Sequence, residues 1–167
     1  MRKIIFIIAI LAAFLSCNAY AGEGATFLEF RNKIFDESRA IKLLLTSSKK
    51  DMIFMNSMWD SCIATMIELD AYFGMLGIFN TIKKENVMEG AVTYLHDWLN
   101  VIKNTNELNI KNLNAISARP IENNAKLHAK RLITYYTELN NRIDAELTKV
   151  AALKITAKKE KTTRKGR

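Results

Sequence analysis

Apolar residues recur at every third or fourth position over residues 52–76, and this is the most regular pattern in the chain. The repeat consists of Met52, Met55, Trp59, Cys62, Met66, Leu69, Phe73 and Leu76. On a helix these positions share one face, so the stretch predicts a helix packed lengthwise against others, as in a coiled coil. The residues that widen this face are Ile63, Ile67, Tyr72 and Phe79. We therefore expect a core helix over about residues 51–80, opened by a capping signal at Ser48 and Asp51, with neighbours on more than one side.

The same spacing predicts three further helices. The first, residues 26–47, opens on a capping box in which Thr26 and Glu29 each satisfy a free backbone amide. Its inward residues are Phe27, Phe30, Ile34, Ile41, Leu44 and Leu45. The third, residues 86–104, turns Met88, Ala91, Leu95, Trp98 and Ile102 inward. The fourth begins at Pro120, which a first helical turn tolerates, and runs to residue 153. Its inward residues are Leu132, Tyr136, Leu139, Ile143, Leu147 and Val150.

These patterns predict an all-α fold, an antiparallel helical bundle of about four helices. No segment alternates apolar and polar residues with the period of two that a half-buried strand needs. Short connections near residues 48 and 81–85 make neighbouring helices antiparallel. The asparagine-rich residues 105–118 are expected to lie on the bundle, as a link or a short extra helix. The predicted helices differ in length, so either the fourth projects beyond the bundle or the core helix bends at Gly74 and Gly77. Close approach of another helix at these glycines is the alternative.

The N-terminus has the three parts of a secretory signal peptide. A basic start, Arg2 and Lys3, precedes an apolar run, and Ala19 and Ala21 form the small-x-small pattern of a cleavage site. The run is shorter than the roughly 20 residues of a transmembrane helix. We therefore expect residues 1–21 to be removed, leaving an exported chain, periplasmic or secreted, without a transmembrane helix.

Cys17 leaves a second possibility for the N-terminus. It follows a serine at the close of the apolar run, an arrangement similar to a bacterial lipobox. The alternative product is a membrane-anchored lipoprotein that begins at a lipidated Cys17.

The excess positive charge is concentrated at the C-terminus. The full chain has a formal net charge of +8, and residues 154–167 contain seven basic residues and one acidic residue. We expect a neutral bundle domain, residues 22–153, and a basic disordered tail, residues 154–167. The tail residues that are candidates for binding an anionic surface are Lys158, Lys159, Lys161, Arg164, Lys165 and Arg167. A surface for specific nucleic-acid binding does not follow, because the bundle itself carries no excess of basic residues.

Catalytic chemistry is poorly represented, so we expect no enzyme. The sequence lacks G-x-S-x-G, H-E-x-x-H, a P-loop and C-x-x-C. Glu68 and Asp70 are two positions apart and do not share a helix face, so they do not form a paired-carboxylate site. Cys62, the only cysteine after residue 21, lies on the apolar face and is interpreted as a small buried hydrophobe. A reactive or dimer-forming thiol is the alternative.

The two histidines are the remaining candidates for ligand binding. His96 lies at the margin of an apolar stripe and His128 near the inward stripe of the fourth helix, and a partly buried, hydrogen-bonded imidazole is the simpler interpretation for each. Two histidines and one cysteine do not readily make a zinc site, so no metal is expected. The core of a four-helix bundle can hold haem, and His128 paired with Met66, or with Met58, is the cofactor-binding alternative. Covalent haem attachment is excluded because C-x-x-C-H is missing.

The sequence thus favours an exported, non-enzymatic helical-bundle protein that binds a protein or envelope partner and holds no cofactor. The alternative is a small-ligand or haem-binding periplasmic four-helix bundle.

Overall fold

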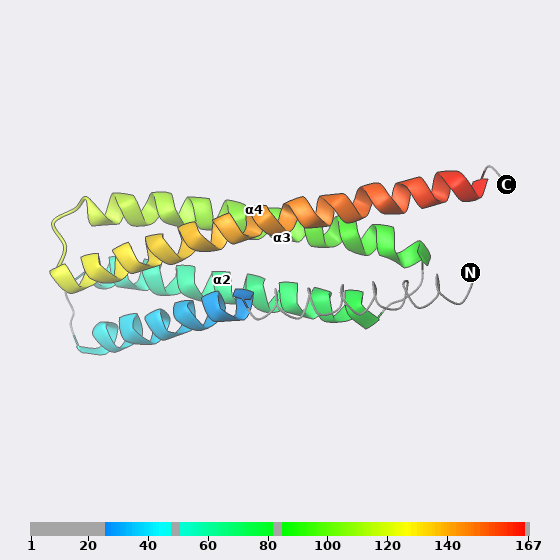
Figure 1. The fold of residues 1–167 in the computed structure, drawn as a ribbon. Coiled ribbons are helices and arrows are strands. Elements are labelled where there is room, and N and C mark those ends of the chain that lie inside the picture. Colours follow the sequence, from blue (N-terminus) through cyan, green and yellow to red (C-terminus); the bar gives the residue numbers. More distant parts are fainter. Residues whose placement is uncertain (1–25, 48–50, 82–84, 166–167) are drawn as a thin grey trace.

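The computed structural model describes residues 26–47, 51–81 and 85–165, and the regular structure in these ranges is entirely helical. An N-terminal helical segment spans residues 26–47. Three longer helices follow: α2 (Met52–Thr81), α3 (Glu85–Ser117) and α4 (Asn123–Lys165). The four lie side by side, with successive helices antiparallel (Figure 1). The predicted all-α antiparallel bundle is confirmed, while the predicted signal peptide and Cys17 lie outside the described residues.

The core runs along the inner faces of all four helices, as the 3-4 spacing predicts. The N-terminal segment buries Phe27, Phe30, Ile34 and Ile41. The buried residues of α2 are Met55, Met58, Cys62, Met66, Leu69, Tyr72 and Leu76. Those of α4 include Ala125, Ala129, Leu132, Tyr136, Leu139, Ile143 and Val150.

The buried face of α2 is rotated slightly from the predicted one. Met58 and Tyr72 are buried, whereas Trp59 and Phe73 are only partly buried and Ile67 is exposed. α2 is apolar on all sides, so its sequence contains adjacent faces that satisfy the same spacing. Packing against three neighbours decides between these faces, and periodicity alone does not.

The glycines of α2 do not interrupt the helix, and no other helix approaches closely at their positions in the described part of the chain. α2 runs continuously through Gly74 and Gly77, and a Cβ atom at either position would have nothing within 4 Å. The interpretation of these glycines as sites of close helix approach is therefore wrong within the described part of the chain.

α3 is longer than predicted, because residues 105–117 continue the helix rather than forming a link. The stripe passes through Asn106, a buried polar residue whose amide is bonded inside the bundle, and then resumes at Leu113 and Ile116. The inner face also differs by one position at its start, where Val92 and Leu99 are buried and Trp98 is only partly buried. An asparagine at a core position looks like the end of an apolar stripe, which explains the early boundary.

α4 continues as a helix to Lys165, whereas the composition predicts a disordered tail from residue 154. Alanine, lysine and glutamate are good helix formers, and residues 157–161 contain only these three types. The C-terminal part of α4 projects past the beginning of α3 (Figure 1), as the unequal helix lengths predict. Of the candidate surface-binding residues, Arg167 lies outside the described range, and the structure does not describe the side chains of the others. The binding role of this segment stays a prediction.

Asp51 joins the beginnings of α2 and α4 at one end of the bundle. Its φ of 58° lies in the left-handed region, which aspartate tolerates better than most residues. Its carbonyl accepts from the amide of Met55 at 3.0 Å, and its Oδ2 accepts from the backbone amide of Glu122 at 2.7 Å. One residue thus satisfies an amide in the first turn of α2 and another just before α4.

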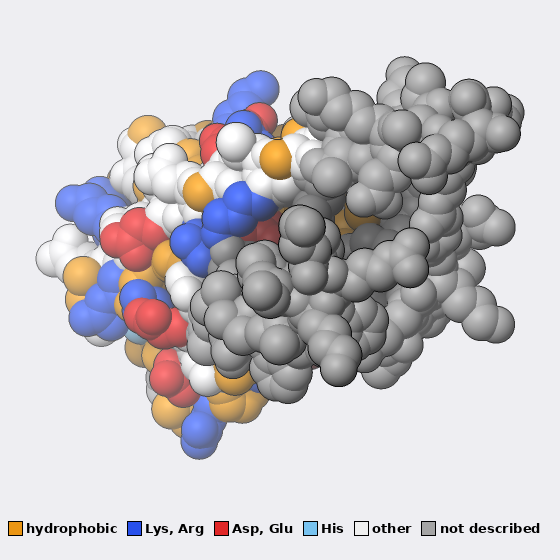
Figure 2. Space-filling view, turned by 45° about the vertical axis from the view of Figure 1, so that its right-hand side comes forward, with side chains coloured by type: hydrophobic (Ala, Val, Ile, Leu, Met, Phe, Trp, Pro, Cys, Tyr) orange, Lys and Arg blue, Asp and Glu red, His pale blue; other side chains and the backbone are white. Residues whose placement is uncertain are grey.

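The surface of the bundle has two further properties that bear on function. In the view of Figure 2, basic and acidic side chains are interspersed over the described part of the face, consistent with the neutral composition of residues 22–153. Among the described residues, one helical stretch, Met52–Ile78 of α2, is long and apolar enough to cross a membrane by length and composition alone, with a mean hydropathy of 1.3. Core helices of globular proteins meet the same criterion, so the feature by itself does not decide the environment of α2.

Candidate functional site

The first candidate is the buried pair formed by Glu37 and His128. Glu37 extends from the N-terminal segment and His128 from the first turns of α4, and these residues are only 6 % and 9 % exposed. The Nδ1 atom of His128 is hydrogen-bonded to Oε1 of Glu37, and Nη1 of Arg131 lies 3.9 Å from Oε2. The carboxylate therefore has a polar partner on each oxygen, as a buried acid requires. This arrangement fixes the N-terminal segment against α4.

A second polar cluster joins α2 to α4 around Cys62. The hydroxyl groups of Ser61 and Tyr136 lie 3.1 Å apart, and both Cys62 and Tyr136 are fully buried. Burial raises the pKa of the Cys62 thiol to about 12, although contact with Tyr136 works in the opposite direction. Burial likewise raises the pKa of the Tyr136 hydroxyl. Since the thiolate is the nucleophile, Cys62 in this site is a packed, unreactive thiol.

Three short polar side chains connect α2, α3 and α4 in the middle of the bundle. The amide of Asn106 donates to the side-chain oxygen of Asn140 at 2.9 Å, and the hydroxyl of Thr65 donates to the Asn106 side chain at 3.5 Å. All three residues are buried. Polar groups of one helix are thus satisfied by those of another, and the chain of bonds links three helices at one level.

Two carboxyl groups, the partly buried Glu68 and the buried Glu146, are less completely paired. Oε1 of Glu68 accepts from Thr105 at 2.8 Å, and burial raises the pKa of the Glu68 side chain. Oε1 of Glu146 accepts from the Tyr72 hydroxyl at 3.5 Å, and burial raises the pKa of Glu146 as well. Burial disfavours the charged form of each carboxyl, which is the physical cause in both cases. These two residues lie on different helices and share no hydrogen-bond partner, so they form no acid–base pair.

The structure separates the two residues of the haem alternative, Met66 and His128. Because Ser61 lies level with Tyr136, Met66 is about level with Asn140, on the parallel helix α4. His128 is 12 residues earlier on α4, roughly 18 Å away along the helix axis at 1.5 Å per residue. Met66 and His128 therefore do not form an axial pair on one iron. Met58 lies only about one turn from the level of His128, whose Nδ1 atom is already bonded to Glu37.

Several ionisable residues at the surface form ion pairs with one another. Arg31 binds Asp70 through two hydrogen bonds of 2.8 and 3.0 Å, and Lys103 lies 2.6 Å from Asp144. His96 contacts Asp97 at 3.3 Å at the surface of α3. Within the described ranges, no group of three or more histidine, cysteine, aspartate or glutamate side chains is placed to hold a metal ion.

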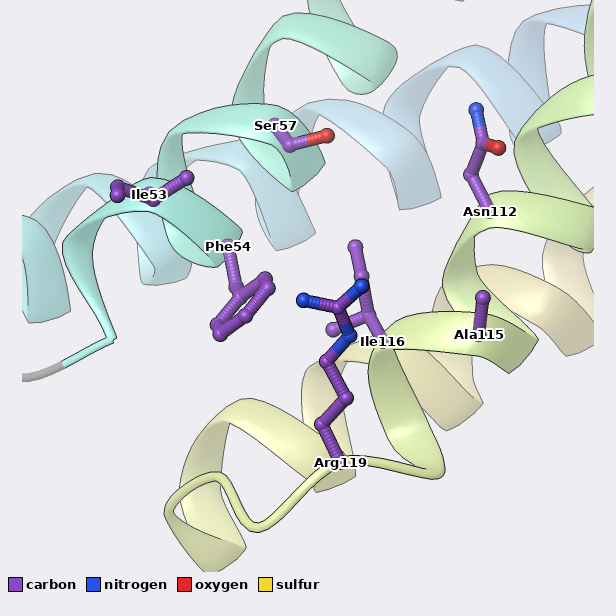
Figure 3. Close-up of a pocket in the computed structure, with 7 residues that line it drawn as sticks. All are labelled: Ile53, Phe54, Ser57, Asn112, Ala115, Ile116 and Arg119. Atoms are coloured by element: carbon purple, nitrogen blue, oxygen red, sulfur yellow. The ribbon is translucent and has the colours of Figure 1, made fainter.

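A groove lies between the beginning of α2 and the end of α3 (Figure 3). Its volume is about 290 Å³, and its lining residues are Ile53, Phe54, Ser57, Asn112, Ala115, Ile116 and Arg119. The guanidinium of Arg119 lies 5.3 Å from the centre of the Phe54 ring, a cation–π contact that lays a charged group over an apolar wall. The groove is therefore suited to an apolar side chain that is flanked by a polar or acidic group.

Further large apolar side chains are exposed along the two helices that form this groove, and we call this set the outer face. It consists of the exposed residues Ile53, Ile67 and Ile78 of α2 and Tyr94, Val101 and Leu108 of α3. The exposed fractions reach 81 % for Ile53 and 64 % for Tyr94. Single exposed apolar residues are normal on a protein surface, whereas several on two adjacent helices make this face a candidate binding surface.

The sequence gives partial signals for the residues that were not predicted. Glu37 falls on the 3-4 stripe between Ile34 and Ile41, and Glu146 falls between Ile143 and Val150. A charged residue on such a stripe signals a buried charge that must find a partner. The identity of the partner, as with His128 for Glu37, depends on how the helices pack and has no local signal.

Comparison of the chain with models of protein families, with curated protein sequences and with solved structures gave no match.

Proposed function

We propose that the chain is an exported, non-enzymatic helical-bundle protein that acts by binding a protein partner through the outer face. One observation carries the proposal, namely the exposed row of large apolar side chains on α2 and α3 that ends in the groove beside Arg119. Such side chains are costly to leave in water, at about 25 cal/mol for each Å² of apolar surface. A partner that covers them gains this free energy on binding.

The chemistry of the interior supports binding rather than catalysis. The Cys62 thiol is packed and has a raised pKa, and the imidazole of His128 is hydrogen-bonded to Glu37 inside the bundle. The groove contains one ionisable side chain, Arg119, and otherwise apolar or neutral polar groups. A general acid or base would need to reach a substrate in such a cleft, and no lining residue has that character.

Photo-cross-linking in cells that produce the full chain tests the proposal. A photoreactive amino acid at Ile67 samples the outer face, and the same amino acid at Thr137, exposed on the far side of α4, is the matched control. We expect an adduct of defined mass from position 67 and none from position 137. If neither position, or both equally, gives an adduct, the outer face is not a specific binding surface.

Export has its own test, because Ala21 and Cys17 lead to different products. Intact-mass analysis of the processed chain is expected to give a protein that begins at Gly22 without lipid. A mass corresponding to a lipid-modified Cys17 would instead make the protein a membrane-anchored lipoprotein.

A further inference from the structure

α2 carries a second stripe with coiled-coil spacing on the side opposite the core. It consists of Ile53, Ser57, Asp60, Ala64, Ile67, Ala71, Gly74 and Ile78, and every one of these residues is exposed. The spacing alternates between four and three residues, as in the contact stripe of two packed helices. We call these eight residues the seam. The core takes the other side of α2, so this seam has no helix packed on it within the described part of the chain.

We propose that the seam pairs with the same seam of a second copy of the chain, in antiparallel orientation about a two-fold axis between residues 65 and 66. This inference rests on the proposed function and names the partner for the outer face. In such an isologous interface the same patch of both copies forms the contact, so the patch must be complementary to itself.

The side chains of the seam are complementary in size under this symmetry. The axis brings Ala64 opposite Ile67 of the second copy, and Ser57 opposite Gly74 of the second copy. It also brings Asp60 opposite Ala71 of the second copy. Each of the three layers nearest the axis therefore contains at least one small residue, which lets the two helices approach closely, and large residues meet only where Ile53 faces Ile78.

The exposed residues of α3 are compatible with the same axis. Thr65 bonds with Asn106, Glu68 bonds with Thr105, and Ser57 and Asn112 line one groove, so the axis position on α2 is level with residues 105–106 of α3. Rotation about that level brings Val101 opposite Ile110 of the second copy, two residues from its Leu108. It also brings Tyr94, the largest exposed residue of α3, to the level of Ser117 of the second copy, two residues from Ala115, which is exposed and small.

The charges on the seam favour a second copy of the chain over a membrane surface as its partner. The α2 seam contains one acid, Asp60, and no basic residue, whereas helices that lie on anionic membranes carry lysine or arginine beside their apolar face. At the rim of α3 the same axis brings Lys111 to the level of Asn100 of the second copy, within one helical turn of its Asp97. Lys111 and Asp97 are both exposed, and the symmetry forms this pair of opposite charges twice.

The size of the surface matches that of a stable dimer. From Ile53 to Ile78 the seam is roughly 38 Å long at 1.5 Å per residue. Two helices of about 10 Å diameter make a face roughly 20 Å wide. The product is close to the 800 Å² or so that each partner contributes to a standard interface.

The mass of the full chain in solution, measured by sedimentation equilibrium at micromolar concentration, tests the proposal. We expect a dimer, and we expect Ile67→Glu and Leu108→Glu each to halve the mass while the circular dichroism spectrum stays helical. Both residues are more than half exposed, so the monomer is expected to tolerate these substitutions. The matched control is Thr137→Glu, on the exposed face of α4, which should remain dimeric. A monomeric wild type, or a dimer that both outer-face variants leave intact, overturns the proposal.

Disulfide trapping tests the orientation, in a Cys17→Ser background that retains the buried and unreactive Cys62. A mixture of Ile53→Cys and Ile78→Cys chains should give a disulfide-linked dimer, because the antiparallel seam brings these positions together. Neither variant alone should do so, since two copies of position 53 lie at opposite ends of the seam. A disulfide formed by Ile53→Cys alone would mean a parallel arrangement and overturn the proposal.

The cross-link at position 67 separates failure of the dimer from failure of the proposed function. An adduct with the mass of two chains supports both. An adduct with another protein, together with a monomeric wild type, overturns the dimer and retains the proposed function. A monomeric wild type without any adduct overturns both.

Discussion

Helices α2 and α4 bury equivalent inner faces, but they present opposite kinds of surface to solvent. Leu69 of α2 and Leu139 of α4 are both fully buried in the same core. The exposed face of α4 over residues 123–149 consists mainly of asparagine, threonine and charged residues, whereas the exposed face of α2 carries Ile53, Ile67 and Ile78. Both helices contribute to the core, but only the exposed residues of α4 are mainly polar. α2 therefore builds the core with one side and exposes large apolar side chains on the other, which is the side that we propose binds a partner.

The charges of the two helices follow the same division. α4 has acidic and basic residues along its length, while α2 contains Asp60, Glu68 and Asp70 and no lysine or arginine. Two of these acids are engaged within the chain, Asp70 by Arg31 and Glu68 by Thr105. The outside of α2 is thus nearly neutral as well as apolar, which favours contact with protein over contact with water.

Truncating the two core leucines tests whether the inner faces are as equivalent as they appear in the structure. Leu69→Ala and Leu139→Ala should each lower the free energy of unfolding by about 2–5 kcal/mol, because each leaves a cavity in a packed core. Urea denaturation followed by circular dichroism measures the change. Thr137→Ala, exposed on α4, is the control and should change the value by less than about 0.5 kcal/mol. A negligible effect at Leu69 alone would mean that α2 does not pack by this side.

Removing one hydroxyl group tests the polar contact between these two helices. Tyr136→Phe deletes the partner of Ser61 without changing the shape of the buried ring, and should cost about 1 kcal/mol. The double variant with Ser61→Ala should cost less than the sum of the single variants, because the residues share one bond. Additive costs in urea denaturation would show that the two hydroxyl groups do not interact.

Each of the two helices also contains one carboxyl whose pKa is raised by burial, the partly buried Glu68 in α2 and the fully buried Glu146 in α4. The folded state holds these protons more tightly than the unfolded chain does. The protonated carboxyls therefore add to the free energy of unfolding below the ordinary carboxyl pKa of about 4.3. This contribution is lost as the pH rises through the pKa that each carboxyl has in the folded protein. Glu68→Gln and Glu146→Gln should each raise the melting temperature by a few degrees at pH 7, and the gain should disappear near pH 4. The exposed Glu138→Gln is the control, and a gain that is the same at both pH values would contradict burial as the cause.

The C-terminal part of α4 should have the smallest effect on folding. Val150 is the last buried residue that the structure describes on this helix, so deletion of residues 155–167 is expected to leave the free energy of unfolding unchanged. The same deletion removes six basic residues and should weaken adsorption to heparin or anionic vesicles at low salt. Adsorption that survives the deletion would locate the anionic-surface contact elsewhere.

Helix number and order could be predicted from the sequence because one period, 3-4, runs through every segment. The same period fails where a helix is apolar on all sides, so the sequence did not distinguish Met58 from Trp59 as the buried residue of α2. It also fails where a polar residue occupies a core position, which is why Asn106 and the asparagines after it looked like a link rather than the middle of α3.

The sequence predicted individual residues of the candidate sites but not which residues lie together. His128 was expected to be partly buried and hydrogen-bonded. The structure buries it and bonds it to Glu37, a partner 91 positions away that no local pattern identifies. The second stripe of α2 is present in the sequence at the spacing of a seam. Whether it faces the core or solvent depends on where α3, α4 and the N-terminal segment lie.

The buried contact between Asn106 and Asn140 has a consequence beyond its own bond energy. Apolar stripes repeat every seven residues, so two long helices can slide past each other by two turns and still match leucine to isoleucine. An amide that slides with them would leave its partner unbonded in the core, at a cost of about 1–3 kcal/mol for each group. The pair, with Thr65 from α2, therefore excludes the slipped arrangements and fixes a single alignment of α2, α3 and α4. Its contribution is to make the native alignment unique, more than to make it stable.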